Sequence, residues 1–271
     1  MSDLTRRDEL VRGLPATARV LLALCRKNVP PPVYESGSYE PTANQIDPLN
    51  QLTGAFPQFT SYLAGKSVLD FGCAEGEQSR AMIRAGARSV HGLDINSAAI
   101  QVAIERSRGI PDLAFSDRMP VNAEFDIIIT QNAFEHFIDA GTILRQMSEV
   151  LAQEGKIFVT FGPTWYSPWG AHIEYFCRVP WVHLWFSEST ITTVRRIYRT
   201  DGASNYTEMG LAKMSLRKFR RLVAASGFAI EYSRLNCIKG LNLLRLTPMR
   251  EFFVSQVNCV LTRQSFRLPI R

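Results

Sequence analysis

The chain has 271 residues, of which 46% are hydrophobic and 21% charged, so it is a folded globular chain and not a disordered one. The formal net charge of +6 allows an anionic partner, but no dense run of lysine and arginine marks a nucleic-acid site, and a generally basic surface accounts for it better. The five cysteines form no C-x-x-C pair, which argues against a zinc knuckle or a redox dithiol and favours reduced thiols. An apolar run at 20–25 is too short to span a membrane and has no convincing cleavage site, so we expect a cytoplasmic protein.

Residues 1–65 predict an N-terminal cap and not an independent domain. A helix is expected over residues 4–27, broken or kinked at Pro15 because proline cannot continue a helical hydrogen-bond ladder. A proline-rich polar stretch without periodicity follows and reaches Asn50, which indicates a loop.

Strands and helices alternate from Ser67 onward. Short apolar strands are expected at 67–71, 89–93, 113–115, 125–130 and 156–161. Helices are expected at 76–86, at 97–106, and from a cap at Asp139 to a stop at Gly155. Continuous apolar strands that alternate with helices are typical of a doubly wound α/β sheet covered on both faces.

An aromatic-rich segment, residues 162–213, interrupts the alternation, and we treat it as an insertion in one domain that covers 66–271. A helix at 215–226 and strands at 228–235 and 253–262 follow it. The leucine-rich segment 238–253 also carries Lys239, Arg245 and Arg250. It is expected to pack beside the last strands, with peripheral membrane contact as the alternative.

The sharpest motif lies between the first strand and the helix after it. Gly72 and Gly76 have the spacing G-x-x-x-G, and they let the backbone approach a ligand closely. A dinucleotide-binding turn would have G-x-G-x-x-G and would hold a pyrophosphate. Here the acidic Asp70 precedes the turn, which disfavours a pyrophosphate and suits a ligand with an ammonium group.

Two further carboxylates end the next two strands. Asp94 follows Gly72 by about twenty residues, where an acidic side chain can accept hydrogen bonds from both ribose hydroxyls. Asp117 ends the third strand and can accept from an adenine amino group. A single aspartate at a strand end is usually a helix cap, but three at consecutive strand ends predict a ligand site along one edge of the sheet.

Residues 66–162 resemble the class I S-adenosylmethionine-dependent methyltransferases, in the broad group that includes the ubiquinone-biosynthesis O-methyltransferases. The matching segments are Val-Leu-Asp-Phe-Gly-Cys-Ala-Glu-Gly, Gly-Leu-Asp-Ile-Asn, Phe-Asp-Ile-Ile-Ile, Glu-His-Phe and Leu-Ala-Gln-Glu-Gly-Lys-Ile-Phe. The resemblance implies a Rossmann-like seven-stranded sheet with an antiparallel last strand. Many members have glycine where this chain has Ala74.

The resemblance also implies S-adenosylmethionine as the cofactor and assigns a role to each motif residue. The implied cofactor residues are Asp70, Gly72, Cys73 and Gly76 around the methionine part, Asp94 on the ribose, Ile95 and Asp117 at the adenine, and Gln131 near the methionyl end.

The leading functional hypothesis is methyl transfer to a hydroxyl oxygen of a small molecule. Transfer to a nitrogen, a glycan or lipid-linked acceptor, and a non-catalytic partner that binds an adenosyl ligand are the alternatives. The Asn-Pro-Pro-Tyr type motif of nucleic-acid amino methyltransferases is absent, since Gln131-Asn-Ala-Phe stands there, so no nucleic-acid partner is expected. Glu135 and His136 allow a metal hypothesis, but Asn132 is a weak third ligand, and no metal is predicted.

We predict that the insertion forms a lid over the acceptor. Most of its aromatic side chains are better explained as the core of a subdomain. His172 and His183 are the predicted catalytic bases, because transfer to a hydroxyl requires removal of its proton. His172 is favoured because it follows the fifth strand more closely, and a structural role is as plausible for either histidine.

Overall fold

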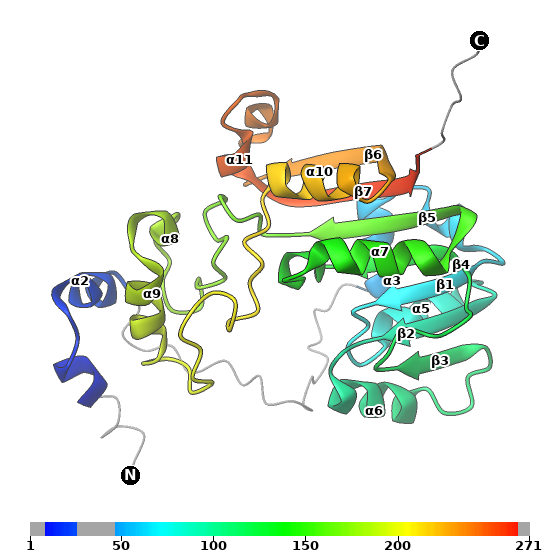
Figure 1. Ribbon diagram of the computed structural model, residues 1–271, viewed down its shortest axis with the longest axis horizontal. Helices are drawn as coiled ribbons and strands as arrows, with labels where there is room; N and C mark the ends of the chain where they lie inside the picture. The colour runs from blue at the N-terminus through cyan, green and yellow to red at the C-terminus, as the bar shows by residue number, and fades with distance from the viewer. Residues whose placement is uncertain (1–8, 26–46, 265–271) are drawn as a thin grey trace.

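A computed structural model describes residues 9–25 and 47–264. Most of the predicted loop that reaches Asn50 lies outside them, and its last three residues, 48–50, are helical instead. Seven strands form one sheet in the order β3-β2-β1-β4-β5-β7-β6 (Figure 1). Their bounds are β1 Ser67–Phe71, β2 Ser89–Leu93, β3 Leu113–Ser116, β4 Phe125–Gln131, β5 Leu151–Phe161, β6 Phe228–Cys237 and β7 Val254–Arg263. The first five strands pair in parallel, and β7 is antiparallel to both β5 and β6, which confirms the predicted fold class.

The helices follow the predicted alternation. Their bounds are α2 Ala16–Leu24, α3 Pro48–Ala55, α4 Phe59–Leu63, α5 Glu77–Arg84, α6 Ser97–Arg106, α7 Ala140–Val150, α8 Val182–Trp185, α9 Glu188–Arg195, α10 Leu216–Ala225 and α11 Arg250–Phe253. Short 3-10 turns lie at η1 Phe134–His136 and η2 Asn242–Leu246. Pro15 is the N-cap of α2, as its effect on a helix predicts. Among the described helices, none is long and apolar enough to cross a bilayer.

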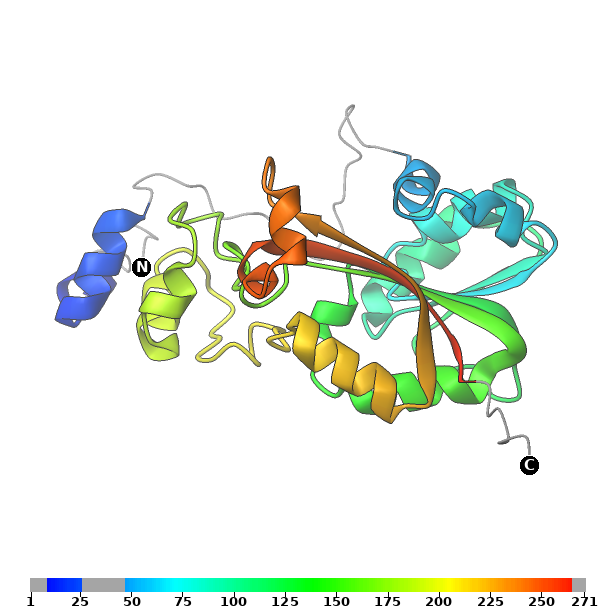
Figure 2. The same cartoon turned by 90° about the horizontal axis from the view of Figure 1, so that it is seen from above.

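Apolar side chains on both faces of the sheet explain its two helical layers. The consecutive isoleucines of β4 alternate: Ile127 and Ile129 face one hydrophobic cluster, and Ile128 faces the other. Helices α3, α4 and α5 cover the first face, and α7 and α10 cover the second (Figure 2). Both faces are therefore buried, so a ligand is expected to bind at the ends of the strands.

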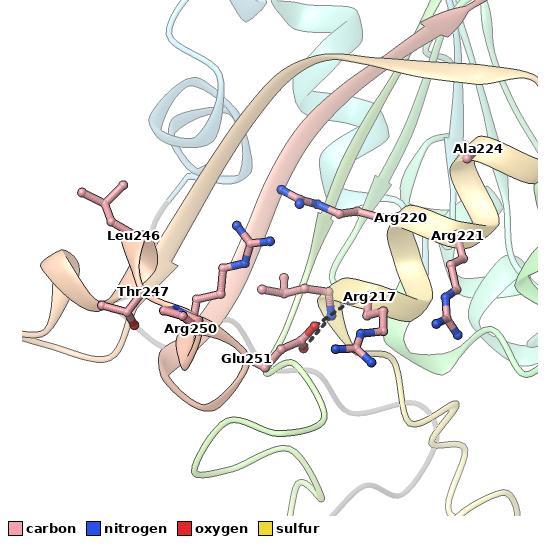
Figure 3. A pocket seen from close by; sticks show the side chains of 10 residues that line it. Arg217, Arg220, Arg221, Ala224, Leu246, Thr247, Arg250 and Glu251 are labelled. Atoms are coloured by element: carbon pink, nitrogen blue, oxygen red, sulfur yellow. Dashed lines mark hydrogen bonds between the residues drawn. The ribbon is translucent and has the colours of Figure 1, made fainter.

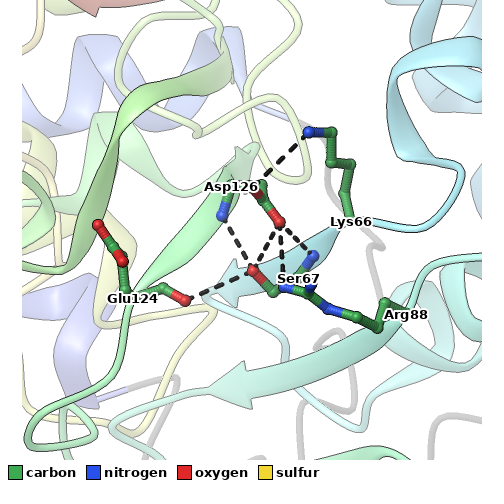
Figure 4. Close-up of polar contacts among 5 residues, drawn as sticks. All are labelled: Lys66, Ser67, Arg88, Glu124 and Asp126. Atoms are coloured by element: carbon green, nitrogen blue, oxygen red, sulfur yellow. Dashed lines mark hydrogen bonds and ion pairs between the residues drawn. The ribbon is translucent and has the colours of Figure 1, made fainter.

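Polar contacts surround Asp126 at the start of β4, at the end of the sheet where the parallel strands begin (Figure 4). Its Oδ2 accepts hydrogen bonds from the backbone N–H of Ser67 (2.8 Å) and from the Ser67 hydroxyl (2.9 Å). Arg88 and Lys66 form ion pairs with the same carboxylate, at 3.3 and 3.7 Å. These contacts join β1 to β4 at the edge opposite the strand ends that carry the predicted ligand residues.

The insertion has a hydrophobic core of its own. Helix α2 packs on α9 of the insertion, at the side of the sheet in Figure 1. Leu21 and Ala18 of α2 are buried against Val182, Ile191 and other apolar residues of the insertion. Within the predicted cap of residues 1–65, α2 therefore packs with the insertion, whereas α3 and α4 pack on the sheet.

One helix boundary expected from the sequence is wrong. Gly155 does not end the helix capped by Asp139, because α7 ends at Val150 and Gly155 lies within β5, next to the irregular pairing with β4. The segment 238–253 lies beside β6, as expected, but Leu243 and Leu246 stay 82% and 79% exposed.

Candidate cofactor and acceptor site

The turn between β1 and α5 depends on its two glycines. Gly72 has a φ of +87° and Gly76 a φ of +76°, a conformation that glycine adopts without steric cost. A Cβ on Gly76 would lie 2.6 Å from the Phe115 ring, so any side chain there would force the ring to move. The turn is fixed to the next strand by the N–H groups of Gly72 and Cys73, which both donate to the Leu93 carbonyl.

Ala74, at the tip of the same turn, is the departure noted in the sequence. It is exposed and has a φ of +47°, a left-handed conformation that an alanine adopts at a cost of about 1–2 kcal/mol. Its backbone N–H donates to Oδ2 of Asp94 at 2.9 Å. Asp94 thus stabilises the strained turn and joins the ends of β1 and β2.

Asp70 lies beneath the turn and is 2% exposed. The Ser79 hydroxyl and the Gln78 amide, both on α5, donate to its two oxygens at 2.5 and 3.0 Å. Burial raises the pKa of Asp70 to about 6, against the opposing effect of these two hydrogen bonds. Its carboxyl group therefore anchors the start of α5 and sets the shape of the turn from below.

The predicted ribose and adenine residues lie together after β2 and β3. Oδ1 of Asp94 accepts from the N–H of Asn96 at 2.9 Å, and Asp117 accepts from the Ser97 hydroxyl at 2.9 Å. Both carboxylates are thus bound to the start of α6. Ile95 is 95% exposed, which leaves its apolar side chain available to a flat ligand ring.

Gln131 and Cys73 occupy the inner part of the same edge. Gln131 ends β4, and its amide donates to the Gln51 side chain of α3 at 2.8 Å. Its own Oε1 is buried and makes no hydrogen bond within the described residues. Cys73 is 6% exposed and its pKa is raised by burial, so its thiol is neutral, and it donates to the Ala74 carbonyl of the turn at 3.7 Å.

The structure brings His172 of the insertion to His136, directly after β4. The two rings are 5.3 Å apart between centroids and nearly perpendicular. Nδ1 of His136 lies 2.8 Å from the Gly210 carbonyl. Burial, with a smaller contribution from His136, lowers the pKa of His172 to about 4, so that ring is neutral at physiological pH.

His183 is placed differently from His172. It is 6% exposed, its Nε2 lies 2.7 Å from the Trp165 carbonyl, and its ring packs edge-on against the Trp165 ring. Burial lowers its pKa as well. It lies within the core of the insertion, and this position favours His172 of the two predicted bases.

His136 was considered in the sequence only as a metal ligand, and its position next to His172 was missed. The usable signal was the Glu-His pair directly after the fourth strand, because residues there lie at the ligand-binding edge of such sheets. Its neighbour Glu135 is 4% exposed, accepts from the N–H of Gly162 at 3.3 Å, and has a pKa raised by burial. Within the described residues, no group of three or more histidine, cysteine or acidic side chains is arranged to hold a metal.

The loops that carry these residues adjoin one another. A Cβ on Gly72 would lie 3.0 Å from the Cβ of Ala133, so the turn after β1 touches the segment after β4. The carboxyl ends of β1, β2, β3 and β4 thus form one edge, where open α/β sheets bind ligands. This sheet order, with an antiparallel β7 and a ligand edge, defines the Rossmann-like methyltransferase class of fold.

Comparisons with known proteins agree with this class. The methyltransferase domain family matches residues 63–163. The chain is 32% identical over 119 residues to the ubiquinone biosynthesis O-methyltransferase of Ralstonia nicotianae, which covers 41% of this chain and 49% of that protein. Its Idiomarina loihiensis counterpart is 32% identical over 131 residues, covering 45% and 51%. The chain thus spans about half the length of the curated relatives it matches.

A solved S-adenosylmethionine-dependent methyltransferase from Mesorhizobium loti has the same fold. Its TM-score is 0.54 at 17% identity, over 80% of this chain and 98% of that one. Residues 63–163 therefore match a methyltransferase domain family, and the sheet has the fold of a solved S-adenosylmethionine-dependent methyltransferase.

Proposed function

We propose that this protein transfers a methyl group from S-adenosylmethionine to a hydroxyl oxygen of a small molecule held between the sheet and the insertion. The observation that carries this proposal is the pair of His136 and His172, one from the strand edge and one from the insertion, with rings 5.3 Å apart. An acceptor placed there lies at the edge that holds the cofactor residues and beside two imidazoles.

The residues at this edge of the sheet fit S-adenosylmethionine. Asp94 and Asp117 are fixed by backbone and hydroxyl donors at the start of α6, where they can accept from the ribose and the adenine amino group. The exposed Ile95 can cover the adenine ring. Asp70 acts from beneath the turn, and the buried, unbonded oxygen of Gln131 is free to accept from the methionyl end of the cofactor.

His136 is the better proton acceptor of the two rings. The Gly210 carbonyl can only accept, so the Nδ1 of His136 must carry the proton, and a neutral ring then has its lone pair on Nε2. His172 stays neutral and adds no positive charge beside the sulfonium or beside a protonated His136. We assign His172 the role of a positioning residue for His136 and for the acceptor.

The chemistry needs only alignment and removal of one proton. The acceptor oxygen attacks the methyl carbon, and the electron pair of the sulfur–methyl bond stays on sulfur to give the thioether product. The hydroxyl proton passes to Nε2 of His136 as the new carbon–oxygen bond forms.

A product screen tests this function. The protein would be incubated with isotopically labelled S-adenosylmethionine and a panel of phenols, sugars and primary amines. We expect label on a hydroxyl oxygen of at least one phenol or sugar and a strong loss with His136→Gln. Label found only on amines, or turnover that is unchanged by His136→Gln, would contradict the proposal.

A further inference from the structure

The connection between β6 and β7, residues 238–253, exposes an unusual share of apolar side chains. Leu243 and Leu246 are 82% and 79% exposed, and Met249 is 56% exposed. Leu241 and Phe252 are each 38% exposed. Large exposed apolar residues gathered in one short segment mark an interaction site, whereas scattered ones do not.

A basic cavity adjoins this segment. It has a volume of about 590 Å³ and lies between the segment and α10 (Figure 3). Its lining includes four arginines, Arg217, Arg220, Arg221 and Arg250. Within the part of the chain that the structure describes, no acidic side chain lies within ion-pairing distance of these four groups.

The one carboxylate in the lining does not neutralise the arginines. Glu251 accepts hydrogen bonds from the backbone N–H groups of Leu216 and Arg217, at 3.1 and 2.8 Å, and so caps the start of α10 (Figure 3). Its charge is directed at the helix N-terminus, where it is favourable. The cavity therefore presents a net positive, unpaired surface next to the exposed leucines.

The position of the surface relates it to the acceptor site. Because β5 and β6 are both antiparallel to β7, β6 ends at the same edge as β5, where the ligand residues lie. The segment also touches the insertion, since the Trp181 indole donates to the Phe252 carbonyl at 3.2 Å and the Tyr166 and Phe252 rings are 5.9 Å apart. A surface bound here would face the same side of the molecule as the insertion.

We propose that residues 238–253 and the arginine face of α10 form a docking surface for an anionic phospholipid bilayer. Guanidinium groups bind phosphate in a bidentate manner, and exposed leucines can insert between the headgroups. Nucleic acid offers the same phosphate but no apolar phase for Leu243 and Leu246, so the leucines favour a lipid surface. Docking does not depend on methyl transfer, and it extends beyond the proposed function.

The test is co-sedimentation of the full chain with vesicles. One set is phosphatidylcholine alone, and the other contains about 30% phosphatidylglycerol. We expect at least about tenfold stronger binding to the anionic vesicles, and weaker binding as salt is raised. The variants Arg220→Glu/Arg221→Glu and Leu243→Ser/Leu246→Ser should each lower this binding by about tenfold or more.

Matched variants elsewhere on the surface give the control. Arg12→Glu/Arg84→Glu makes the same charge change, and Ile104→Ser/Val121→Ser removes exposed apolar groups from other elements. Both should bind vesicles like the unmodified chain, and all four variants should bind S-adenosylhomocysteine normally by calorimetry. Equal binding to both vesicle types, an equal loss in the control variants, or arginine-dependent binding to a DNA duplex without binding to vesicles would overturn the proposal.

Discussion

The sheet half of the molecule and the insertion half are built in different ways. The sheet positions its predicted ligand residues through regular strands, so Asp94 and Asp117 lie where the chain order and the parallel pairing place them. The insertion uses two short helices and irregular backbone, and it depends on α2, far away in the sequence, to complete its core. Regular structure can hold a common cofactor in many proteins, whereas irregular structure can be shaped for one acceptor.

The two halves meet at His136 and His172. The sheet half is assigned the cofactor and the proton acceptor His136, and the insertion half is assigned His172 and the wall of the acceptor site. Changes in the sheet turns should therefore alter cofactor affinity, and changes at the meeting point should alter the transfer step.

The largest effect is expected at the meeting point. His136→Ala should lower the single-turnover rate by about 10²–10⁴-fold, because the acceptor proton loses its base, while cofactor affinity stays nearly unchanged. His172→Ala should lower the rate by about 10²-fold, and His183→Ala should act mainly on stability. The rate would be measured by rapid quench at saturating cofactor. A larger loss with His183→Ala than with His136→Ala would reverse the assignment.

The two halves should also respond oppositely to pH. The pKa of Asp70 is raised to about 6, so its contribution to the free energy of unfolding is present below about pH 4 and is lost as pH rises through about 6. The pKa of His172 is lowered to about 4, so its contribution is present above about pH 6.5 and is lost as pH falls through about 4.

Urea unfolding between pH 4 and 7 separates these contributions. Relative to the unmodified chain, Asp70→Asn should gain stability as pH rises, by about 3 kcal/mol at most. His172→Gln should lose stability relative to the unmodified chain over the same range, by about 2 kcal/mol, because its ring is partly exposed. If both differences stayed constant with pH, the burial of these two groups would not govern their titration.

Substitution of Asp94 tests cofactor binding separately from the transfer step. Asp94→Ala should weaken S-adenosylmethionine and S-adenosylhomocysteine by about 1.5–3 kcal/mol, roughly 10–100-fold, because the ribose loses a charged acceptor. Asp117→Ala should have a smaller effect, since Asp117 is exposed. Calorimetry would give both affinities, and thermal unfolding would verify that each variant is folded. Unchanged affinity in Asp94→Ala would remove Asp94 from the cofactor site.

The sequence was informative wherever function follows from local order. Three carboxylates at consecutive strand ends were sufficient to predict that they share one edge of the sheet, since parallel strands bring their carboxyl ends together. The meeting of His136 and His172 was not predictable, because α7, β5 and the irregular start of the insertion separate them and His172 has a φ of +52°. The helix end predicted at Gly155 was wrong, because glycine often follows a helix but here lies in the irregular first part of β5. A Cβ at this position would lie 2.7 Å from the Leu151 side chain, so the close packing there requires glycine.

The smallest effect is expected at Ala74. Ala74→Gly should raise the free energy of unfolding by about 0.5 kcal/mol, because relief of the left-handed alanine slightly exceeds the added entropy of the unfolded chain. Ala98→Gly, in α6 without positive φ, should lower it. Urea denaturation at neutral pH compares the two. Destabilisation of equal size in both would show that the turn is not strained.

The pH profile of the single-turnover rate tests the assignment of His136 most directly. The assay would use an acceptor found in the product screen, at saturating cofactor, with the unmodified chain and His136→Gln. We predict that the unmodified chain is about 10²-fold or more faster than His136→Gln across the whole pH range in which both are folded. A variant that keeps the same pH profile at near-normal rate would show that the proton leaves the acceptor by another route.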